Sequence, residues 1–151
     1  MKFSIRIAVF GGRNIEDDVY KDVTEIGRLI AAENWLVYCG GGKGVMEAIA
    51  KGVQMGGGTC VGILKGTSLE ESNGFLTVPV ATGMGISRNA LLAYNCDAAL
   101  AISGQYGTLS EIAYAFQLNK PVIGYKTWDL EGIHKVKSPT EVIEKVRGLL
   151  E

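Results

Sequence analysis

The sequence predicts an α/β fold in which a doubly wound, mainly parallel sheet carries helices on both of its faces. The first observation is that short apolar runs alternate with longer segments whose apolar residues recur at helical spacing. The second is that the short runs are apolar throughout, as expected of strands that are buried on both faces. Strands and helices that alternate in this way form right-handed crossover units, and we expect residues 1–151 to form a single domain.

Each short apolar run is bounded by glycine or polar residues, which set the limits of a predicted strand. The strands are expected at residues 4–10, 35–39, 59–64, 98–102 and 122–125, with a short extended run at 75–80. A polar loop, residues 65–74, precedes that extended run, and loops of this kind often cover a site. In such a sheet we expect a ligand at the carboxyl ends of the strands.

Helices are predicted where apolar residues repeat at intervals of three or four. The first helix carries Val19, Val23, Ile26 and Ile30 on one face. The second carries Val45, Met46, Ile49 and Val53 and ends at the glycines 56–58, and two more are expected at 86–95 and 108–118. The last begins at Ser138, where Ser-Pro-Thr-Glu combines a capping box with proline at the first helical position. The whole pattern is that of a Rossmann-like three-layer sandwich.

Composition narrows the classes of function. With 47% apolar and 21% charged residues the chain has the balance of an ordinary globular protein, and no apolar run approaches the roughly 20 residues that span a membrane. The amino terminus runs directly into a strand pattern without the apolar core of a signal peptide, so we expect a cytoplasmic protein with no membrane partner. The net charge is −1 with scattered basic residues, which argues against a nucleic-acid partner and favours a small anionic ligand.

The residues that most often bind metals or act as nucleophiles are sparse. Cys39, Cys60 and Cys96 are odd in number, widely spaced and set in apolar segments, so we expect buried free thiols. His134 is the only histidine and stands in a polar stretch, where we expect a surface residue. A histidine metal site and a Ser-His-Asp triad are both disfavoured, and we expect neither a metal nor a required cofactor.

Glycine-rich stretches begin at Gly11, Gly40 and Ser103, and each follows an apolar run and precedes a helical pattern. This is the sequence form of a phosphate-binding turn, because glycine lets the backbone approach a ligand and the following helix offers unpaired N–H groups. The standard nucleotide motifs are missing. The strand before Gly40 ends without the carboxylate that would hold a ribose hydroxyl of NAD, and Lys43 is not followed by the Ser or Thr of a Walker P-loop.

The stretch from Gly104 to Glu111 is the most specific of these features, because it places a flexible turn, a hydroxyl and a carboxylate within one helical entry. One interpretation is structural: Thr108 caps the helix, and Glu111 completes a capping box three positions later. The other is functional: the N–H groups near Gly107 and Thr108 hold a phosphate, and Glu111 reaches a sugar hydroxyl or an electron-poor carbon. The two are compatible, because a capping carboxylate can also face a ligand.

A second constellation, residues 83–89, places Arg88 and Asn89 at the start of a helix. A cation there opposes the helix dipole, so Arg88 needs a phosphate or an acidic side chain as its partner, unless it is simply solvated. For Lys43 and Arg13 we expect solvation, although either could add positive charge near a ligand. The apolar runs 90–94 and 112–116 would serve equally as core or as a face for a second copy.

At these residues the chain resembles the superfamily that joins the Lonely Guy (LOG) cytokinin-activating phosphoribohydrolases, the molybdenum-cofactor carrier proteins and a set once labelled "possible lysine decarboxylases". The resemblance covers nearly the whole chain. The Gly-Gly-Gly turn of the superfamily corresponds to residues 40–46, and its Pro-Gly-Gly-x-Gly-Thr-x-x-Glu signature corresponds to residues 103–111. Ser103 and Gln105 replace a proline and a glycine of the hydrolases, and residues 83–89 look closer to the carrier-like branch. No lysine suits the pyridoxal phosphate chemistry of a decarboxylase.

The resemblance implies a homodimer that binds a phosphorylated nucleotide or a pterin-type cofactor such as the molybdenum cofactor. Our first hypothesis is a binding or carrier protein; the alternative is a nucleoside 5′-monophosphate phosphoribohydrolase, for which the resemblance implies that Arg88 and Glu111 are catalytic. A metabolite sensor is not separated from the carrier by sequence. The residues expected to bind the ligand are Gly11, Gly12, Gly41, Gly42, Gly85, Ser87, Arg88, Asn89, Gly104, Gln105, Tyr106, Gly107, Thr108 and Glu111.

Overall fold

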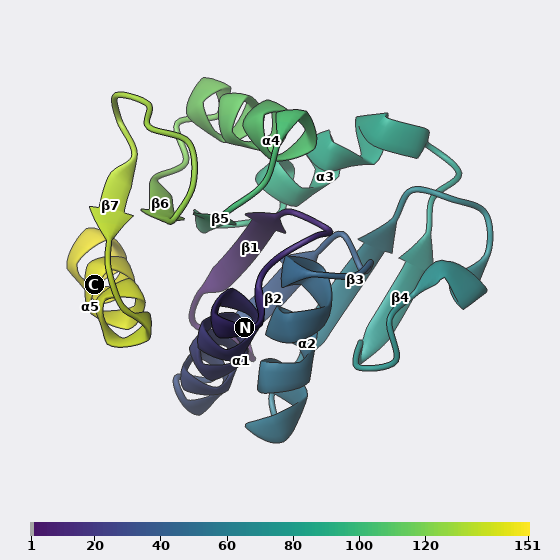
Figure 1. Ribbon diagram of the computed structural model, residues 1–151, viewed down its shortest axis with the longest axis horizontal. Helices are drawn as coiled ribbons and strands as arrows, with labels where there is room; N and C mark the ends of the chain where they lie inside the picture. The colour runs from purple at the N-terminus through teal and green to yellow at the C-terminus, as the bar shows by residue number, and fades with distance from the viewer. Residues whose placement is uncertain (1) are drawn as a thin grey trace.

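The sheet is parallel throughout (Figure 1). The computed structural model describes residues 2–151, and within them seven strands lie in the order β4-β3-β2-β1-β5-β6-β7. The strands are β1 Arg6–Gly11, β2 Leu36–Cys39, β3 Cys60–Leu64, β4 Val78–Ala81, β5 Ala98–Ile102, β6 Val122–Tyr125 and β7 His134–Val136. Every neighbouring pair is parallel. The predicted doubly wound parallel sheet is therefore confirmed.

Helices cover both faces of the sheet, as predicted. They are α1 Asp17–Ala32, α2 Val45–Met55, α3 Asn89–Tyr94, α4 Tyr106–Gln117 and α5 Pro139–Leu150. In Figure 1 α3 and α4 lie together above the sheet, whereas α1, α2 and α5 lie below it. The short helices η1, Leu69–Glu71, and η2, Gly85–Arg88, belong to the connections on either side of β4. Within residues 2–151 no helix is both long and apolar enough to cross a membrane.

The central strand β1 shows why the sequence requires three layers. Its side chains alternate between the two hydrophobic cores: Ile7 and Val9 pack with α1, α2 and α5, whereas Ala8 and Phe10 pack with α3 and α4. All four are at most 1% exposed. Because successive side chains of a strand point to opposite faces, a strand that is apolar at every position can be buried only between two layers of helices.

Some local predictions were wrong. Strand β7, which contains the half-buried His134, was not predicted, because it is a short edge strand without an apolar run. The helix expected at 86–95 begins instead as the 3-10 turn η2 and becomes α-helical only at Asn89. Gly83 and Gly85, with φ of 64° and 63°, force the chain to turn at that point. The predicted cap of α5 is confirmed, since the Ser138 side chain accepts a hydrogen bond from Glu141 N. The cysteines are free and buried, as predicted.

The order of the strands creates a switch point between β1 and β5. From β1 the chain proceeds outward through β2, β3 and β4, and it then returns to β5 on the other side of β1. The loops that leave the carboxyl ends of β1 and β5 therefore diverge, and in parallel sheets the crevice between such loops is where ligands bind. The fold thus places the turns after Gly11 and Ile102 side by side.

Candidate functional site

The glycine-rich turns predicted from the sequence meet at this switch point. A Cβ added at Gly12 would lie 3.2 Å from the backbone of Gly104, so the turns after β1 and β5 are in contact. The turn after β2 is tied to them by Val45 N, which donates to Gly12 O over 2.9 Å. Gly44, with φ of 68°, leaves no room for a side chain, because its Cβ would lie 2.3 Å from Gly12 O. Glycine is required here by close backbone contact.

A cavity of about 680 Å³ opens between these turns. Its wall contains the ends of four neighbouring strands, β3, β2, β1 and β5, together with η2, the start of α4 and the loop after β3. The lining residues are Val9, Gly11, Gly12, Arg13, Asn14, Gly40, Gly42, Met46, Leu64, Lys65, Glu71, Ile86, Arg88, Asn89, Ser103, Gly104, Gln105, Gly107, Thr108 and Glu111.

Most of the residues predicted to bind the ligand line this cavity, but four do not. Gly41 belongs to the turn after β2 but does not line the cavity, and its carbonyl accepts a hydrogen bond from Asn73 N. Gly85 and Ser87 are exposed on η2, where the Ser87 hydroxyl donates to Met84 O. Tyr106 is 79% exposed and lies near the Trp128 ring, with the ring centroids 6.2 Å apart. These four residues could act on a ligand only from the rim or through a neighbour.

The start of α4 offers free donors to the cavity. The helix begins at Tyr106, its N-cap Gln105 makes no side-chain cap, and the first N–H paired within the helix is that of Leu109. The N–H groups of Tyr106, Gly107 and Thr108 therefore have no protein acceptor within the described residues. Unpaired N–H groups and the positive end of the helix dipole together attract anions. A Cβ at Gly107 would meet nothing within 4 Å, so the approach is open.

The capping-box interpretation of Thr108 and Glu111 was wrong. Thr108 is the third residue of α4 and not its cap, and its side chain packs against the turn, where a Cβ at Gly104 would lie 2.1 Å from Thr108 Oγ1. Thr108 is 3% exposed and Glu111 8% exposed. The helix α4 begins two residues earlier than predicted. Both side chains therefore form part of the cavity wall, and neither caps the helix terminus.

The two residues that depart from the hydrolase signature adopt distinct backbone conformations. Ser103 has φ of 52°, in the left-handed region, and its N–H donates to Lys126 O over 3.0 Å. Proline has neither that φ nor an N–H. Gln105 has φ of −120° and ψ of −135°, outside both the helical and the extended regions, and its carbonyl accepts a hydrogen bond from Trp128 Nε1. The turn after β5 is therefore held from outside by the segment after β6.

Arg88 is held at the strand ends and is not simply solvated. Its Nη1 donates to Gly40 O over 2.8 Å and to Ile63 O over 2.6 Å, which join η2 to the ends of β2 and β3. Its Nε is buried without a partner among the described residues. Burial lowers the pKa of Arg88, and the neighbouring Glu111 opposes this effect. The guanidinium thus remains a cation with an unused donor beside the cavity.

Glu111 is the second ionisable group buried at the site. Burial raises its pKa to about 8, although the positive charge of Arg88 acts in the opposite direction. No ion pair within 4 Å links Glu111 to Arg88 among the described residues. At pH 7 the Glu111 carboxyl is therefore mostly protonated, and it can donate a proton or a hydrogen bond where an ordinary glutamate cannot.

Asn89 connects α3 to the first turn of α4. Its Nδ2 donates to Ser110 Oγ over 3.2 Å, and Ser110 Oγ donates in turn to Gly107 O. Asn89 is buried and lines the cavity, and its hydrogen bond to Ser110 ties it to the first turn of α4. Asn89 and Arg88 line the same cavity, which agrees with the expectation that they act at one site. Ligand contact by either residue stays a prediction.

Sequence reasoning missed several residues of the cavity wall. Arg13 was expected to be solvated; it is exposed, but it also lines the cavity beside Asn14. Lys65 and Glu71 come from the polar loop after β3, which was predicted to cover a site without a residue being assigned. Lys43 is exposed and does not line the cavity. The available signal was the position of each missed residue, because all of them follow a strand end.

An all-parallel, doubly wound sheet with a glycine-lined cavity at its switch point defines a Rossmann-like α/β protein. The chain belongs to the SLOG cluster4 family, whose model matches residues 4–148. The resemblance to the LOG and molybdenum-cofactor carrier superfamily is thereby confirmed.

Sequence relatives lie in both prokaryotes and plants. An uncharacterized protein of Archaeoglobus fulgidus is 35% identical over 140 residues, which cover 92% of each chain. The probable cytokinin riboside 5′-monophosphate phosphoribohydrolase LOGL9 of rice, Oryza sativa subsp. japonica, is 35% identical over 112 residues, which cover 71% of this chain and 49% of the rice protein. The chain therefore spans only about half the length of that relative.

Solved structures match more completely. The molybdenum cofactor binding protein of Rippkaea orientalis superposes with a TM-score of 0.92 at 28% identity, covering 97% of this chain and 98% of that one. The molybdenum cofactor carrier protein of Chlamydomonas reinhardtii gives 0.88 at 29% identity, covering 97% and 99%. DNA processing protein A of Helicobacter pylori, at 14% identity, shares the fold alone.

Proposed function

We propose that this protein binds a phosphorylated nucleotide or a pterin-type cofactor, whose phosphate lies at the start of α4. The observation that carries the proposal is the pair of free N–H groups at Gly107 and Thr108, two residues that line a cavity which also holds the Arg88 cation; the free N–H of Tyr106 lies next to them in the chain. An anion at this position would satisfy the helix terminus and offset the buried charge of Arg88. Gly107 leaves room for the phosphate oxygens, because a Cβ there would meet nothing within 4 Å.

The binding or carrier role is favoured over hydrolysis by the turn after β5. Ser103 adopts a left-handed backbone that the proline of the hydrolase signature cannot adopt, and Gln105 adds a side chain where the hydrolases have none. The phosphate cradle therefore differs in shape from a proline-led turn. Structures named for binding and carrying the molybdenum cofactor match nearly the full chain, which supports the same choice.

The molybdenum cofactor is one ligand that the cavity residues fit at its phosphate end. The unpaired Nε of Arg88 and the open approach at Gly107 suit a terminal phosphate. The cofactor would bring its own metal and pterin. Arg88 and the N–H groups of α4 would then orient it, and the apolar side chains of Met46 and Ile86 would exclude water from one side.

A second candidate function, hydrolysis of a nucleoside 5′-monophosphate, is favoured by one observation, the burial of the Glu111 carboxyl in the cavity wall. In that reaction the N-glycosidic bond breaks, water adds to the sugar carbon and the departing base takes up a proton. A carboxyl with a pKa of about 8 could supply that proton at neutral pH, while Arg88 holds the phosphate. The positive charge of Arg88 would not favour the oxocarbenium-like transition state unless the phosphate neutralised it.

One experiment separates these functions. Purified protein is incubated with AMP, GMP and inorganic phosphate while the midpoint of thermal unfolding and the release of free base are followed, with Glu111→Gln and Arg88→Gln as variants. We expect stabilisation by the nucleotides without base release, and loss of that stabilisation in Arg88→Gln. Base release that Glu111→Gln abolishes would establish the hydrolase instead. Absence of both effects with every phosphorylated compound would refute an anion site at α4.

We further propose that the protein is a homodimer that uses the α3–α4 face of the sheet. Tyr38, Val61 and Val78 pair across β2, β3 and β4 on this face; the first two are only partly buried and Val78 is exposed. Beside them Tyr94 is 64% exposed, and apart from buried Glu111 neither α3 nor α4 carries a charged residue. Interfaces are depleted of charge and enriched in aromatic residues. Sedimentation of the wild type and of Tyr94→Glu tests this, and a monomeric wild type would contradict it.

The remaining expectations about partners and compartment stay proposals. We propose that the protein has no nucleic-acid partner, because its net charge of −1 offers no basic surface for a phosphate backbone. We also propose a cytoplasmic location and the absence of a membrane partner, because no apolar run in the sequence approaches the length that spans a membrane. Filter binding to single-stranded DNA at low salt would test the first of these proposals.

A further inference from the structure

The cavity has a second polar end, far from the α4 terminus. Its wall crosses the ends of β5, β1, β2 and β3, and neighbouring strands lie about 4.8 Å apart, so the cavity extends roughly 14 Å along the sheet edge. If the phosphate lies at α4, the opposite end of an extended nucleotide reaches the loop after β3. Lys65 and Glu71 line the cavity there.

The Glu71 carboxylate is held close to the start of this loop. A Cβ added at Gly66 would lie 1.9 Å from Glu71 Oε1 and 2.2 Å from Oε2, so the carboxylate occupies the space that glycine leaves open. Lys65 is the adjacent residue and lines the same part of the cavity. No ion pair between Lys65 and Glu71 is present among the described residues. Both side chains are exposed, so a donor and an acceptor line the same cavity without pairing with each other.

The loop is fixed to the phosphate-binding part of the site by Asn73. Asn73 N donates to Gly41 O over 2.8 Å, and Asn73 Nδ2 donates to Gly42 O over 2.9 Å. Lys65 O accepts from Gly85 N over 2.8 Å, which ties the loop to η2 as well. The backbone that carries Lys65 and Glu71 is therefore tied to the glycine turn and to η2, as a recognition element requires.

We propose, on the basis of the proposed function, that Lys65 and Glu71 select a fused heterocycle whose edge presents a carbonyl, a ring N–H and an exocyclic amino group. This edge is shared by guanine and pterin. The carboxylate accepts two hydrogen bonds from the N–H and the amino group, and the ammonium donates to the carbonyl. Adenine presents an amino group next to a ring nitrogen lone pair, which would face the Glu71 carboxylate without a proton between them.

The test compares ligands that differ by one group. Binding of GMP, IMP, AMP and neopterin 3′-monophosphate is measured by titration calorimetry with the full chain. IMP lacks only the 2-amino group of GMP. A hydrogen bond to a charged group corresponds to a preference of roughly tenfold to hundredfold. We expect GMP or neopterin 3′-monophosphate to bind tighter than IMP by that factor, and the comparison between these two identifies the source of the heterocycle.

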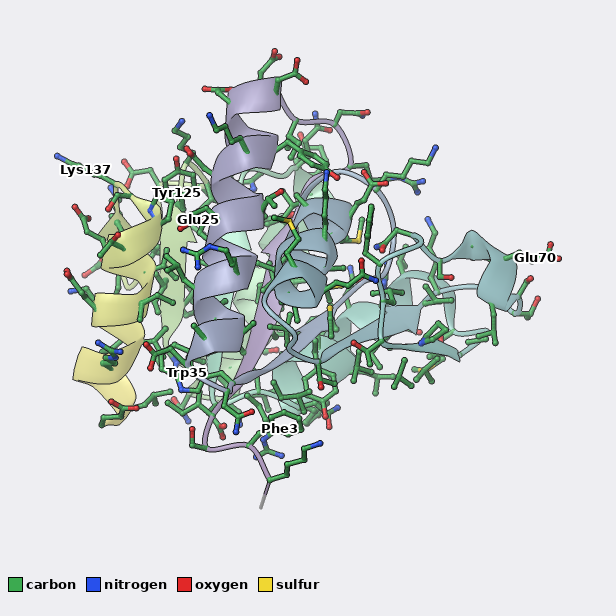
Figure 2. All side chains as sticks on the ribbon, turned by 90° about the horizontal axis from the view of Figure 1, so that it is seen from below. Phe3, Glu25, Trp35, Glu70, Tyr125 and Lys137 are labelled. Atoms are coloured by element: carbon green, nitrogen blue, oxygen red, sulfur yellow. The ribbon has the colours of Figure 1, made fainter. Side chains whose placement is uncertain are left out.

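Matched variants assign the preference to Glu71. Glu71→Gln should reduce the preference over IMP to roughly threefold or less, because the amide keeps the size but loses the charge. Glu70→Gln is the control: Glu70 is the preceding carboxylate, does not line the cavity, and projects away from the body of the molecule in Figure 2. Gly66→Ala should mimic Glu71→Gln by displacing the carboxylate, whereas Gly74→Ala, in the same loop with open space around it, should not.

The outcomes distinguish this proposal from the proposed function. Binding of IMP or AMP as tight as that of GMP and neopterin 3′-monophosphate, or an unchanged preference in both Glu71→Gln and Gly66→Ala, would overturn the role of Glu71 and leave the phosphate site intact. If none of the four phosphorylated compounds binds, the proposed function fails together with it.

Discussion

Replacement of Glu111 by glutamine should make the protein more stable at neutral and alkaline pH, by an amount that depends on pH. Burial raises the pKa of Glu111 to about 8 from an ordinary value of 4.5, and its side chain makes no hydrogen bond to another described residue that the amide would break. Glutamine has nearly the same shape, carries no ionisable proton and is neutral at every pH. The variant therefore removes one titration and little else.

The magnitude follows from proton linkage. Below pH 4.5 the carboxyl is protonated in both the folded and the unfolded chain, so ionisation has no effect on stability. Between pH 4.5 and about 8 the folded state keeps a proton that the unfolded state has released, and each pH unit lowers the free energy of unfolding by about 1.4 kcal/mol. The loss amounts to about 3 kcal/mol at pH 7 and levels off near 5 kcal/mol above pH 8.

Urea denaturation of the wild type and of Glu111→Gln at pH 5, 6, 7 and 8 measures this difference, because all other titrating groups cancel between the two proteins. We expect the stability of the variant relative to the wild type to grow by about 3 to 4 kcal/mol across this range. A carbon-13 NMR titration of the Glu111 carboxyl should show its midpoint near 8. A difference that stays constant with pH would refute the claim that Glu111 is held neutral.

The remaining predictions concern the turns and Arg88. At Gly104 the φ angle is 91° and a Cβ would lie 2.1 Å from Thr108 Oγ1, so Gly104→Ala should lower the free energy of unfolding by about 2 kcal/mol or more. Gly107→Ala should instead leave stability unchanged but weaken binding of inorganic phosphate in a competition assay. Arg88→Lys should destabilise by about 1–2 kcal/mol in urea, because the lysine ammonium ends one bond short of Nη1, the nitrogen that makes both carbonyl contacts; equal stability would contradict this. Ser103→Pro should destabilise by about 3 kcal/mol or more, and an unchanged urea midpoint would show that the turn is not left-handed.

The fold was largely predictable because its signals are strong and local. Strands such as β5, Ala98–Ile102, are buried at every position. A short, wholly apolar run between two helical patterns is typical of a strand in a parallel sheet that is covered on both faces. The short edge strand β7 gave no such signal, because a strand of three residues that is paired on one side only needs no apolar pattern. The split of the helix at 86–95 depends on positive φ angles at Gly83 and Gly85, which the composition of the stretch permits but does not require.

The site was predictable at its backbone and less so at its side chains. Glycine-rich turns can be recognised in the sequence, and the turns at Gly12, Gly42 and Gly104 line one cavity in the structure. The start of α4 was placed two residues too late, because Thr108 and Glu111 have the spacing of a capping box and the sequence does not show that both are buried. Glu71 was missed because its position depends on how a polar loop folds back over Gly66, a contact with no periodic pattern.

The charges of the cavity lead to one conclusion about its ligand. Arg88 remains a cation with an unpaired Nε, and Glu111, the nearest buried acid, is mostly protonated at pH 7 and does not neutralise it. A buried charge without a partner costs several kcal/mol, and the free N–H groups of α4 add to the positive potential of the same cavity. A dianionic phosphate would be attracted by both, and it would also raise the pKa of Glu111 further. Ligand binding and proton uptake at Glu111 are therefore expected to be coupled.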